Sequence, residues 1–238
     1  MARAEDRHWW YLGMAVITSA LLRRWLPGGS SRTILDAGCG TGGAMTSFLP
    51  GFGRVVGLDL SPLALDFCQQ RGAQPLTRGS VTHLPFQSAS FDLLTSFDVL
   101  YTRTVPDVQA ALVEFARVLT PGGHLLLRLP AYNWLRGRHD HAVWTAHRFT
   151  RREVAQLLTA SGLAVRHTSY ANTFLFPFAL LKRLGERIFP PPPTASDLSL
   201  PPRLLNQIFA ILLKAEAPLV ARGGLPFGLS VFALAQKT

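Results

Sequence analysis

The stretch Leu35-Asp-Ala-Gly38-Cys-Gly40-Thr-Gly42-Gly43 decides the fold of this chain. It continues an apolar run that begins at Thr33, which is typical of a buried strand, and it leads directly into a helical pattern. Glycines between a strand and a helix let backbone N–H groups approach a ligand that side chains would keep away. Gly38, Gly40 and Gly43 also satisfy G-x-G-x-x-G, the dinucleotide fingerprint. The glycines alone therefore indicate a nucleotide-like ligand without choosing the cofactor.

Strand and helix patterns alternate along the rest of the chain. Apolar runs predict strands at 33–36, 54–59, 91–97 and 124–129, with weaker strands at 74–76, 164–171 and 228–235. Apolar spacing and capping signals predict helices at 8–26, 61–71, 107–119 and 150–161. Such alternation is typical of a parallel, doubly wound α/β sheet with helices on both faces.

Length and composition fit a single domain. With 238 residues, of which 48% are hydrophobic and only 16% charged, the chain has ample material for a core, which excludes disorder over most of its length. We expect one domain over residues 1–238: a helical lead-in at 1–29, a cofactor-binding core at 30–173, a helical insert at 174–227 and a final strand at 228–238.

The chain is basic, with 24 Lys and Arg against 14 Asp and Glu and a net charge of +10. A positive surface favours anionic partners such as nucleic acid, phosphorylated lipids or acidic substrates. The arginines are scattered, and no Asn-Pro-Pro-Tyr-like tetrapeptide follows the strand at 91–97 to orient a base. We therefore do not expect a nucleic-acid substrate, and no obligate protein partner is evident.

Cysteines and apolar runs bear on the compartment. Cys39 and Cys68, the only cysteines, show neither disulfide nor metal spacing. The apolar stretch 11–22 ends at Arg23-Arg24, is too short to span a bilayer and has no cleavage pattern of a signal peptide. We expect a cytoplasmic protein, whose mean hydropathy of +0.20 leaves apolar surface for the inner face of a membrane or for a partner.

Two acidic residues bear on which nucleotide-like ligand binds. Asp36 stands two residues before Gly38, where its carboxylate can reach a ligand ammonium, a cation that a nicotinamide dinucleotide lacks. Asp59 ends the second strand, nineteen residues beyond Gly40, where it can accept hydrogen bonds from both hydroxyls of a ribose. Asp36 therefore favours adenosylmethionine, whereas Asp59 is compatible with either nucleoside cofactor.

Four motifs in order give the chain a family resemblance. They are 35–43, 56–61, the pair 84–86 with 91–92, and Arg117-Val-Leu-Thr-Pro-Gly-Gly123. Over residues 33–130 the chain resembles the class I S-adenosylmethionine-dependent methyltransferases. The resemblance implies a Rossmann-like seven-stranded sheet of order 3-2-1-4-5-7-6, with an antiparallel strand 7 and, in this chain, a helical insert before it.

The resemblance also implies a set of residues that bind S-adenosyl-L-methionine. They are Asp36, Ala37, Gly38, Gly40, Gly42, Asp59, Leu60, Ser80, Val81 and Phe97. Asp36, Gly38 and Gly40 would hold the methionine part, Asp59 and Leu60 the ribose and the adenine edge, and Ser80 and Val81 would flank the adenine. Many relatives carry Asp where this chain has Ser80, so the contact to the adenine amino group is expected to be weaker here.

A narrower resemblance concerns the acceptor. His8-Trp-Trp10, 129–135, 139–140, 147–150 and 225–230 are similar to a bacterial methyltransferase subgroup often found beside genes for glycan or lipid-linked sugar assembly. It implies methyl transfer to an O, N or C atom of a small-molecule or lipid-linked acceptor.

Residues for this second substrate lie mostly on loops after the strands, where ligands bind in such sheets. His139 and His147 are the first candidates for a general base, ahead of Asp140 and His141. His8 and Trp10 would form a lid, although aromatic residues there can equally anchor the first helix. Tyr101 would line the acceptor pocket. Because a sulfonium makes its methyl group electrophilic, no metal ion is expected.

Two alternatives stay open at this level. One is a nicotinamide-dependent oxidoreductase, and the other is a binding protein at a membrane that has kept the fold without turnover. The insert either roofs the acceptor pocket or, through 174–221 with its basic Lys182 and Arg183, rests peripherally on a membrane.

Overall fold

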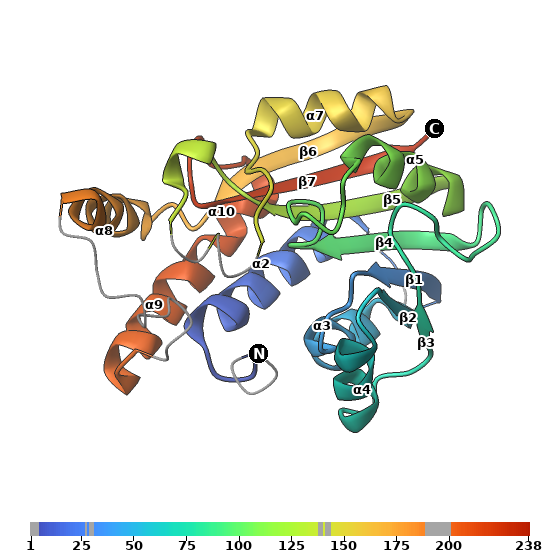
Figure 1. Ribbon diagram of the computed structural model, residues 1–238, viewed down its shortest axis with the longest axis horizontal. Helices are drawn as coiled ribbons and strands as arrows, with labels where there is room; N and C mark the ends of the chain where they lie inside the picture. The colour runs from blue at the N-terminus through green and yellow to red at the C-terminus, as the bar shows by residue number, and fades with distance from the viewer. Residues whose placement is uncertain (1–4, 27, 29–30, 138–139, 141–143, 189–200) are drawn as a thin grey trace.

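The computed structural model describes residues 5–26, 28, 31–137, 140, 144–188 and 201–238. Within them, a seven-stranded sheet has the order β3-β2-β1-β4-β5-β7-β6 (Figure 1). The strands are β1 (Arg32–Ala37), β2 (Gly53–Asp59), β3 (Leu76–Arg78), β4 (Phe91–Phe97), β5 (Leu119–Pro130), β6 (Leu163–Ala171) and β7 (Ser230–Lys237). Strand β7 is antiparallel to β5 and β6, and the other pairs are parallel. The predicted fold class and strand order are confirmed.

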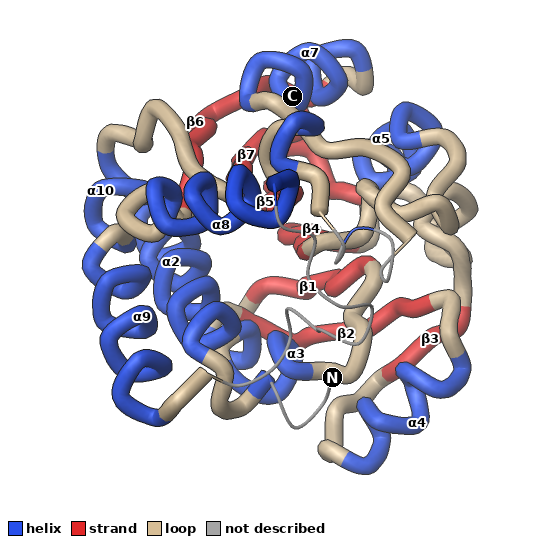
Figure 2. The backbone as a smooth tube through the Cα atoms, turned by 60° about the vertical axis from the view of Figure 1, so that its left-hand side comes forward, coloured by secondary structure: helices blue, strands red, loops and turns tan. Residues whose placement is uncertain are grey.

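Helices cover both faces of this sheet (Figure 1). One face carries α5 (Val108–Val118) and α7 (Arg151–Ala160), and the other carries α2 (Trp9–Trp25), α3 (Gly43–Ser47), α4 (Pro62–Gln70) and α10 (Ala217–Arg222). α9 (Arg203–Ala215) packs on the outside of α2, and α8 (Phe176–Ile188) lies across the carboxyl end of the sheet (Figure 2). Short 3-10 helices, η1 (Leu49–Gly51) and η2 (Asn133–Leu135), complete the connections.

Side chains at the helix starts explain where the helices begin. The Ser61 hydroxyl accepts from the backbone of the third residue on, and Pro62 occupies the first turn of α4. Asp107 caps α5 in the same way. Thr150 and Glu153 form the predicted reciprocal capping box of α7.

Two apolar layers hold the sheet between its helices. Successive strand residues face opposite sides, so in β4 Leu94 packs in the layer with Phe115 of α5, while Leu93 packs in the layer with Ile17 of α2. The central strands are buried on both faces, which explains why they appear in the sequence as continuous apolar runs.

Some predicted boundaries differ from the structure. Strand β5 begins at Leu119, directly after α5, because Leu119 pairs with Phe91 before a register shift leads to the pairing of Leu93 with His124. Residues 120–123, between the two paired positions of β5, form the irregular part of the strand. The sequence predicted that the strand begins only at residue 124. Strand β3 starts two residues later than predicted, where it pairs with the last residues of β2.

The helical insert before the last strand is also present, as α8, α9 and α10 between β6 and β7. Among the described residues, Arg203–Arg222 is the stretch whose length and apolar composition would suffice to cross a membrane. In this fold it is divided into α9 and α10 at Glu216, whose carboxylate is buried.

Candidate functional site

A cavity of about 1290 Å³ opens where β1, β4 and β5 end. The carboxyl ends of the strands are where open α/β sheets bind ligands. The glycine turn after β1 lines one end of the cavity, which we call the cofactor end. The start of α2, the loop after β5 and the insert helices line the other, which we call the acceptor end.

The glycine turn approaches the cavity with its backbone. Gly38 and Gly40 have φ of 84° and 57°, which glycine adopts without strain. A Cβ on Gly38 would collide with Val99, whereas one on Gly40 would meet no atom within 4 Å. The N–H groups of Gly38 and Cys39 both donate to the carbonyl of Leu58, at 2.7 and 2.9 Å. The turn is therefore fixed to β2 and bare toward the cavity.

Asp59 links this turn to the next one. One carboxylate oxygen accepts from Gly40 N and the other from Ser61 N, both at 2.9 Å. The side chain also lines the cavity. Because a carboxylate has about four acceptor positions, Asp59 keeps capacity for two further donors on its cavity side.

Asp36 is a buried carboxyl group at the end of β1. It accepts from the Thr95 hydroxyl at 2.8 Å and, in the part of the chain that the structure describes, forms no ion pair. Burial raises the pKa of Asp36 to about 7, against lowering contributions from the Thr95 hydrogen bond and from Arg128. A cation entering the cavity would favour the ionised carboxylate, so this residue suits a ligand ammonium.

Most of the predicted cofactor residues line the cavity, and two do not. Those that line it are Asp36, Gly38, Gly40, Asp59, Leu60, Ser80, Val81 and Phe97. Ala37 is buried in the core under the turn, and Gly42 caps α3 with φ of 82°. The geometry indicates that these two residues shape the backbone of the turn and do not contact a ligand directly. The hydroxyl of Ser80 is hydrogen-bonded to the hydroxyl of Thr82, at 2.8 Å.

The aromatic residues of the N-terminal segment form a wall of the acceptor end. His8, Trp10 and Tyr101 all line the cavity. The guanidinium of Arg128 lies over the Trp10 ring, with its central carbon 4.7 Å from the ring centroid. The same carbon lies 5.0 Å from the centroid of the Phe97 ring. Trp10 therefore lines the cavity and also packs at the start of α2, and the lid stays a prediction.

Arg128 was not predicted from the sequence. It sits in an otherwise apolar strand, is almost completely buried and bonds to Asp98 at 2.7 Å. A single charged residue within the run at 124–129 was the available signal. Its pairing with Asp98, which follows β4 with φ of 57°, depends on the neighbouring positions of β4 and β5 and is invisible in either segment alone.

Of the predicted general bases, His147 is not brought to the cavity. His147 is outside the lining: its Nε2 lies 2.6 Å from Glu153 and its Nδ1 lies 3.2 Å from the Asn133 amide. The capping box of α7 thus holds this imidazole away, which corrects the expectation that it faces the acceptor. His139 and His141 lie outside the described residues.

Asp140 does line the cavity, in a form that does not suit a base. Burial acts to raise the pKa of its carboxyl, but hydrogen bonds from Arg148 and from the N–H of Gly137 outweigh it and leave the pKa below its ordinary value. Arg148 bonds to both carboxylate oxygens, at 2.7 and 3.1 Å. The pair is a fixed, buried wall of the acceptor end.

Asn172 is a further lining residue that the sequence did not reveal. It follows β6 with φ of 62°, is 2% exposed, and its amide oxygen has no hydrogen-bond partner among the described residues. Glu216, fully buried between α9 and α10, accepts from Asn172 N at 2.6 Å and from Phe174 N at 2.7 Å. The insert therefore fixes the loop that carries Asn172 into the cavity lining.

Glu5 lines the cavity beside the glycine turn. Its carboxylate accepts from the Thr41 hydroxyl at 2.6 Å, pairs with Arg71 of α4 at 3.1 Å and lies where a Cβ on Gly43 would be. The N-terminal segment is thereby attached to the cofactor end. Gly38 and Gly40 line the same cavity.

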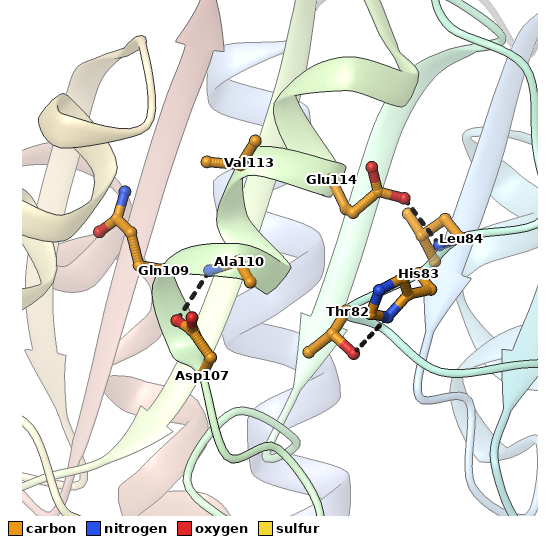
Figure 3. A pocket seen from close by; sticks show the side chains of 8 residues that line it. All are labelled: Thr82, His83, Leu84, Asp107, Gln109, Ala110, Val113 and Glu114. Carbon is orange, nitrogen blue, oxygen red and sulfur yellow. Dashed lines mark hydrogen bonds between the residues drawn. The ribbon is translucent and has the colours of Figure 1, made fainter.

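A separate pocket lies between α5 and the loop at 82–84 (Figure 3). Its polar groups are engaged with one another: Glu114 accepts from Leu84 N, and Asp107 accepts from Ala110 N. It shares no lining residue with the larger cavity. We assign it no function.

Comparison with known proteins decides the family. Residues 35–127 match a family model described as a methyltransferase domain. The chain contains a class I S-adenosylmethionine-dependent methyltransferase domain. The match includes the glycine turn, Asp36 and Asp59, and it favours the methyltransferase over the dinucleotide interpretation of the glycine spacing.

Curated relatives share the methyltransferase domain. A demethylmenaquinone methyltransferase of Lactiplantibacillus plantarum is 38% identical over 130 residues, 50% of this chain and 50% of that protein. A phthiotriol/phenolphthiotriol dimycocerosates methyltransferase of Mycobacterium leprae is 33% identical over 120 residues, 48% of this chain and 42% of that protein. The chain thus spans about half the length of the curated relatives it matches.

A solved structure extends the similarity of fold beyond the matched stretch. The geranyl diphosphate C-methyltransferase of Streptomyces coelicolor, solved with S-adenosyl-L-homocysteine, has a TM-score of 0.62 and 16% identity, covering 93% of this chain and 76% of that chain. The methyltransferase fold therefore includes the outer strands, whereas the family match ends before the acceptor-end residues Asp140, Arg148 and Asn172.

Proposed function

We propose that this protein transfers the methyl group of S-adenosyl-L-methionine to an O, N or C atom of a small-molecule or lipid-linked acceptor. The observation that carries the proposal is one cavity whose cofactor end has a bare glycine turn between the carboxylates of Asp36 and Asp59. Two curated relatives are named for demethylmenaquinone and for phthiotriol or phenolphthiotriol dimycocerosates as acceptors, which supports this class of substrate.

The residues of the cofactor end fit S-adenosyl-L-methionine. Asp36, buried and without an ion-pair partner in the described chain, would hold the ammonium of the methionine part. Asp59 would accept from the ribose hydroxyls with its remaining acceptor positions. Leu60 and Val81 offer apolar walls to the adenine, and Gly40 leaves the space that a side chain would fill.

The chemistry that the cofactor supplies is an electrophilic methyl group on a sulfonium. The protein's part is to bind the acceptor in line with that methyl group and to exclude water. Positioning of this kind lowers a barrier by roughly 7–11 kcal/mol. Trp10, stacked on Arg128, and the fixed Asp140–Arg148 pair supply rigid walls for this purpose.

Proton transfer, where the acceptor needs it, is not assigned to a described histidine. Burial lowers the pKa of His8, and its Nδ1 accepts from Trp10 N, so the neutral ring carries its proton on Nε2. Burial, followed by the nearby Asp98, raises the pKa of Tyr101, which therefore acts as a hydroxyl donor at neutral pH. His139 stays a prediction.

The proposal is tested with cofactor labelled in its methyl group. The protein is incubated with an extract of its host, and products are analysed by mass spectrometry. We expect labelled mass gain on a lipid, sugar or phenolic compound with the wild type and with Asp66→Ala on the exposed side of α4, and none with Asp59→Ala. Binding of the cofactor without any labelled product would instead support a protein that has kept the fold and lost turnover.

A further inference from the structure

The outward face of α9 is apolar. Leu204, Ile208 and Ile211, spaced by four and three residues, form one stripe along the helix and are 68%, 41% and 65% exposed. The opposite side, with Ala210 and Leu213, is buried against α2. A helix on the surface of a globular protein normally turns polar residues outward. α9 is therefore apolar on both sides, and one side has no covering in the part of the chain that the structure describes.

Helix α8 repeats the pattern. Phe178 and Leu181 are each 66% exposed, and Phe174, four residues before Phe178, is also exposed. The side of α8 that carries Arg183 is turned inward, where its guanidinium packs against Gly137. α8 therefore turns Phe178 and Leu181 outward, while Phe176 of the same helix packs inward against the rings of Tyr132, Trp134 and Phe227.

Both helices border the acceptor end of the cavity. Phe178 and Ala179 of α8 line it, as do Phe209 of α9 and Pro201 just before that helix. Phe178 is both lining and largely exposed, which places it at the opening. α8 and α9 lie on the same side of the molecule, beyond the carboxyl ends of the strands (Figure 2). The two apolar stripes therefore adjoin the route into the cavity.

Cationic side chains accompany these stripes. Arg203 and Lys214 are exposed and, being eleven residues apart, lie on the same edge of α9. Arg7 is exposed beside them, since Asn206 of α9 donates to the Arg7 carbonyl at 2.8 Å. None of these three side chains forms an ion pair within the described residues. No Asp or Glu occurs in α9, and the whole chain carries a net charge of +10.

We propose that α8 and α9 form a docking surface for an anionic lipid bilayer, through which an acceptor with an apolar chain enters the cavity directly from the membrane. Apolar stripes insert at the level of the acyl chains, and the cationic edge remains with anionic headgroups, which is how interfacial amphipathic helices bind. The entry route rests on the proposed methyltransferase function, whereas bilayer binding itself does not. The cationic edge favours lipid over a second copy of this equally basic chain.

The test is co-sedimentation of the full chain with vesicles of phosphatidylglycerol and phosphatidylcholine. We expect binding that weakens when phosphatidylglycerol is omitted and when the salt concentration is raised. Ile211→Glu should weaken binding about tenfold or more, because it removes a large apolar side chain from the lipid and adds a negative charge. Leu63→Glu on α4 is the matched control, since Leu63 is 64% exposed and lies away from α8 and α9 (Figure 1). That variant should bind as the wild type does.

Calorimetry with S-adenosyl-L-homocysteine on the same preparations separates this proposal from the proposed function. Unchanged cofactor affinity in Ile211→Glu, together with lost vesicle binding, supports the docking surface. Equal vesicle binding by the wild type and Ile211→Glu would overturn it, as would no binding by the wild type. A dimer in solution that Ile211→Glu dissociates would also overturn it, because a second copy would then cover the stripe.

Discussion

The two ends of the cavity differ in how their residues are brought together. At the cofactor end, Asp36 and Asp59 lie at the ends of the neighbouring strands β1 and β2, and the glycine turn comes directly after β1. At the acceptor end, Trp10 and Asn172 come from segments that are far apart in the sequence and meet only in the folded chain. The difference teaches that the lining residues of the cofactor end come from motifs at the ends of adjacent strands, whereas those of the acceptor end are brought together by tertiary packing.

The largest effect is expected for Asp59→Ala. Two hydrogen bonds from ribose hydroxyls to a carboxylate would be lost, and each is worth about 1.5–3 kcal/mol. Cofactor affinity should fall at least about a hundredfold by calorimetry, while the unfolding free energy falls by only about 1–2 kcal/mol, because Gly40 N and Ser61 N lose their acceptor. Asp66→Ala on the exposed side of α4 should change neither quantity. Unchanged cofactor affinity in Asp59→Ala would contradict the assignment of Asp59 to the ribose at the cofactor end.

Asp36→Asn should weaken cofactor binding roughly ten- to a hundredfold and change its pH dependence. With a pKa of about 7 in the free protein, Asp36 must lose its proton to bind an ammonium. Wild-type affinity should therefore rise from pH 6 to pH 8, and the variant's affinity should be low and flat. A steep pH dependence that survives in Asp36→Asn would assign the titration to another group.

The same substitution should stabilise the protein. The pKa of Asp36 is raised above 3.8, the ordinary value of an aspartate, so the stabilising contribution of its protonated form is fully present below that value. Its contribution is lost as pH rises toward about 7. At pH 8, Asp36→Asn should raise the free energy of unfolding by roughly 2–4 kcal/mol. Denaturation by urea at pH 5 and pH 8 measures this, and the gain should be smaller at pH 5. An equal gain at both pH values would contradict the raised pKa.

The sequence predicted the sheet, and most of the residues that line one end of the cavity, because their signals are local. The glycines, the caps at Ser61 and Thr150 and the apolar runs each act within a few residues of themselves. It did not predict Arg128, whose partner lies on the neighbouring strand, or the removal of His147 by Glu153. A loop histidine is an attractive base in a sequence, but only the packing of α7 decides which way its ring turns.

Glu216→Gln tests whether a change at the acceptor end leaves cofactor binding at the other end of the cavity unaffected. Burial raises the pKa of Glu216, against backbone hydrogen bonds from residues 172–174 that lower it. A glutamine keeps one acceptor oxygen for two N–H donors, so the unfolding free energy should fall by about 1–3 kcal/mol. Cofactor affinity should stay within about twofold, as calorimetry checks. A loss of affinity comparable to that of Asp59→Ala would show that the two ends are coupled.

The smallest effect is expected for Glu5→Gln. The variant keeps an acceptor for Thr41 but loses the charge that pairs with Arg71, so the N-terminal segment is held less firmly over the turn. We expect cofactor affinity to fall about two- to fivefold. Asp6→Asn, at the exposed end of the same arginine pair, should have no effect. Tighter binding in Glu5→Gln would indicate that Glu5 occupies space that the cofactor needs.

The most direct measurement is a crystal structure of the protein with S-adenosyl-L-homocysteine. We predict both ribose hydroxyls within hydrogen-bond distance of the Asp59 carboxylate and the amino group beside Asp36, with the backbone of Gly38 and Gly40 against the ligand. A nucleoside bound elsewhere, or a glycine turn covered by the protein's own side chains while the ligand is present, would contradict the account.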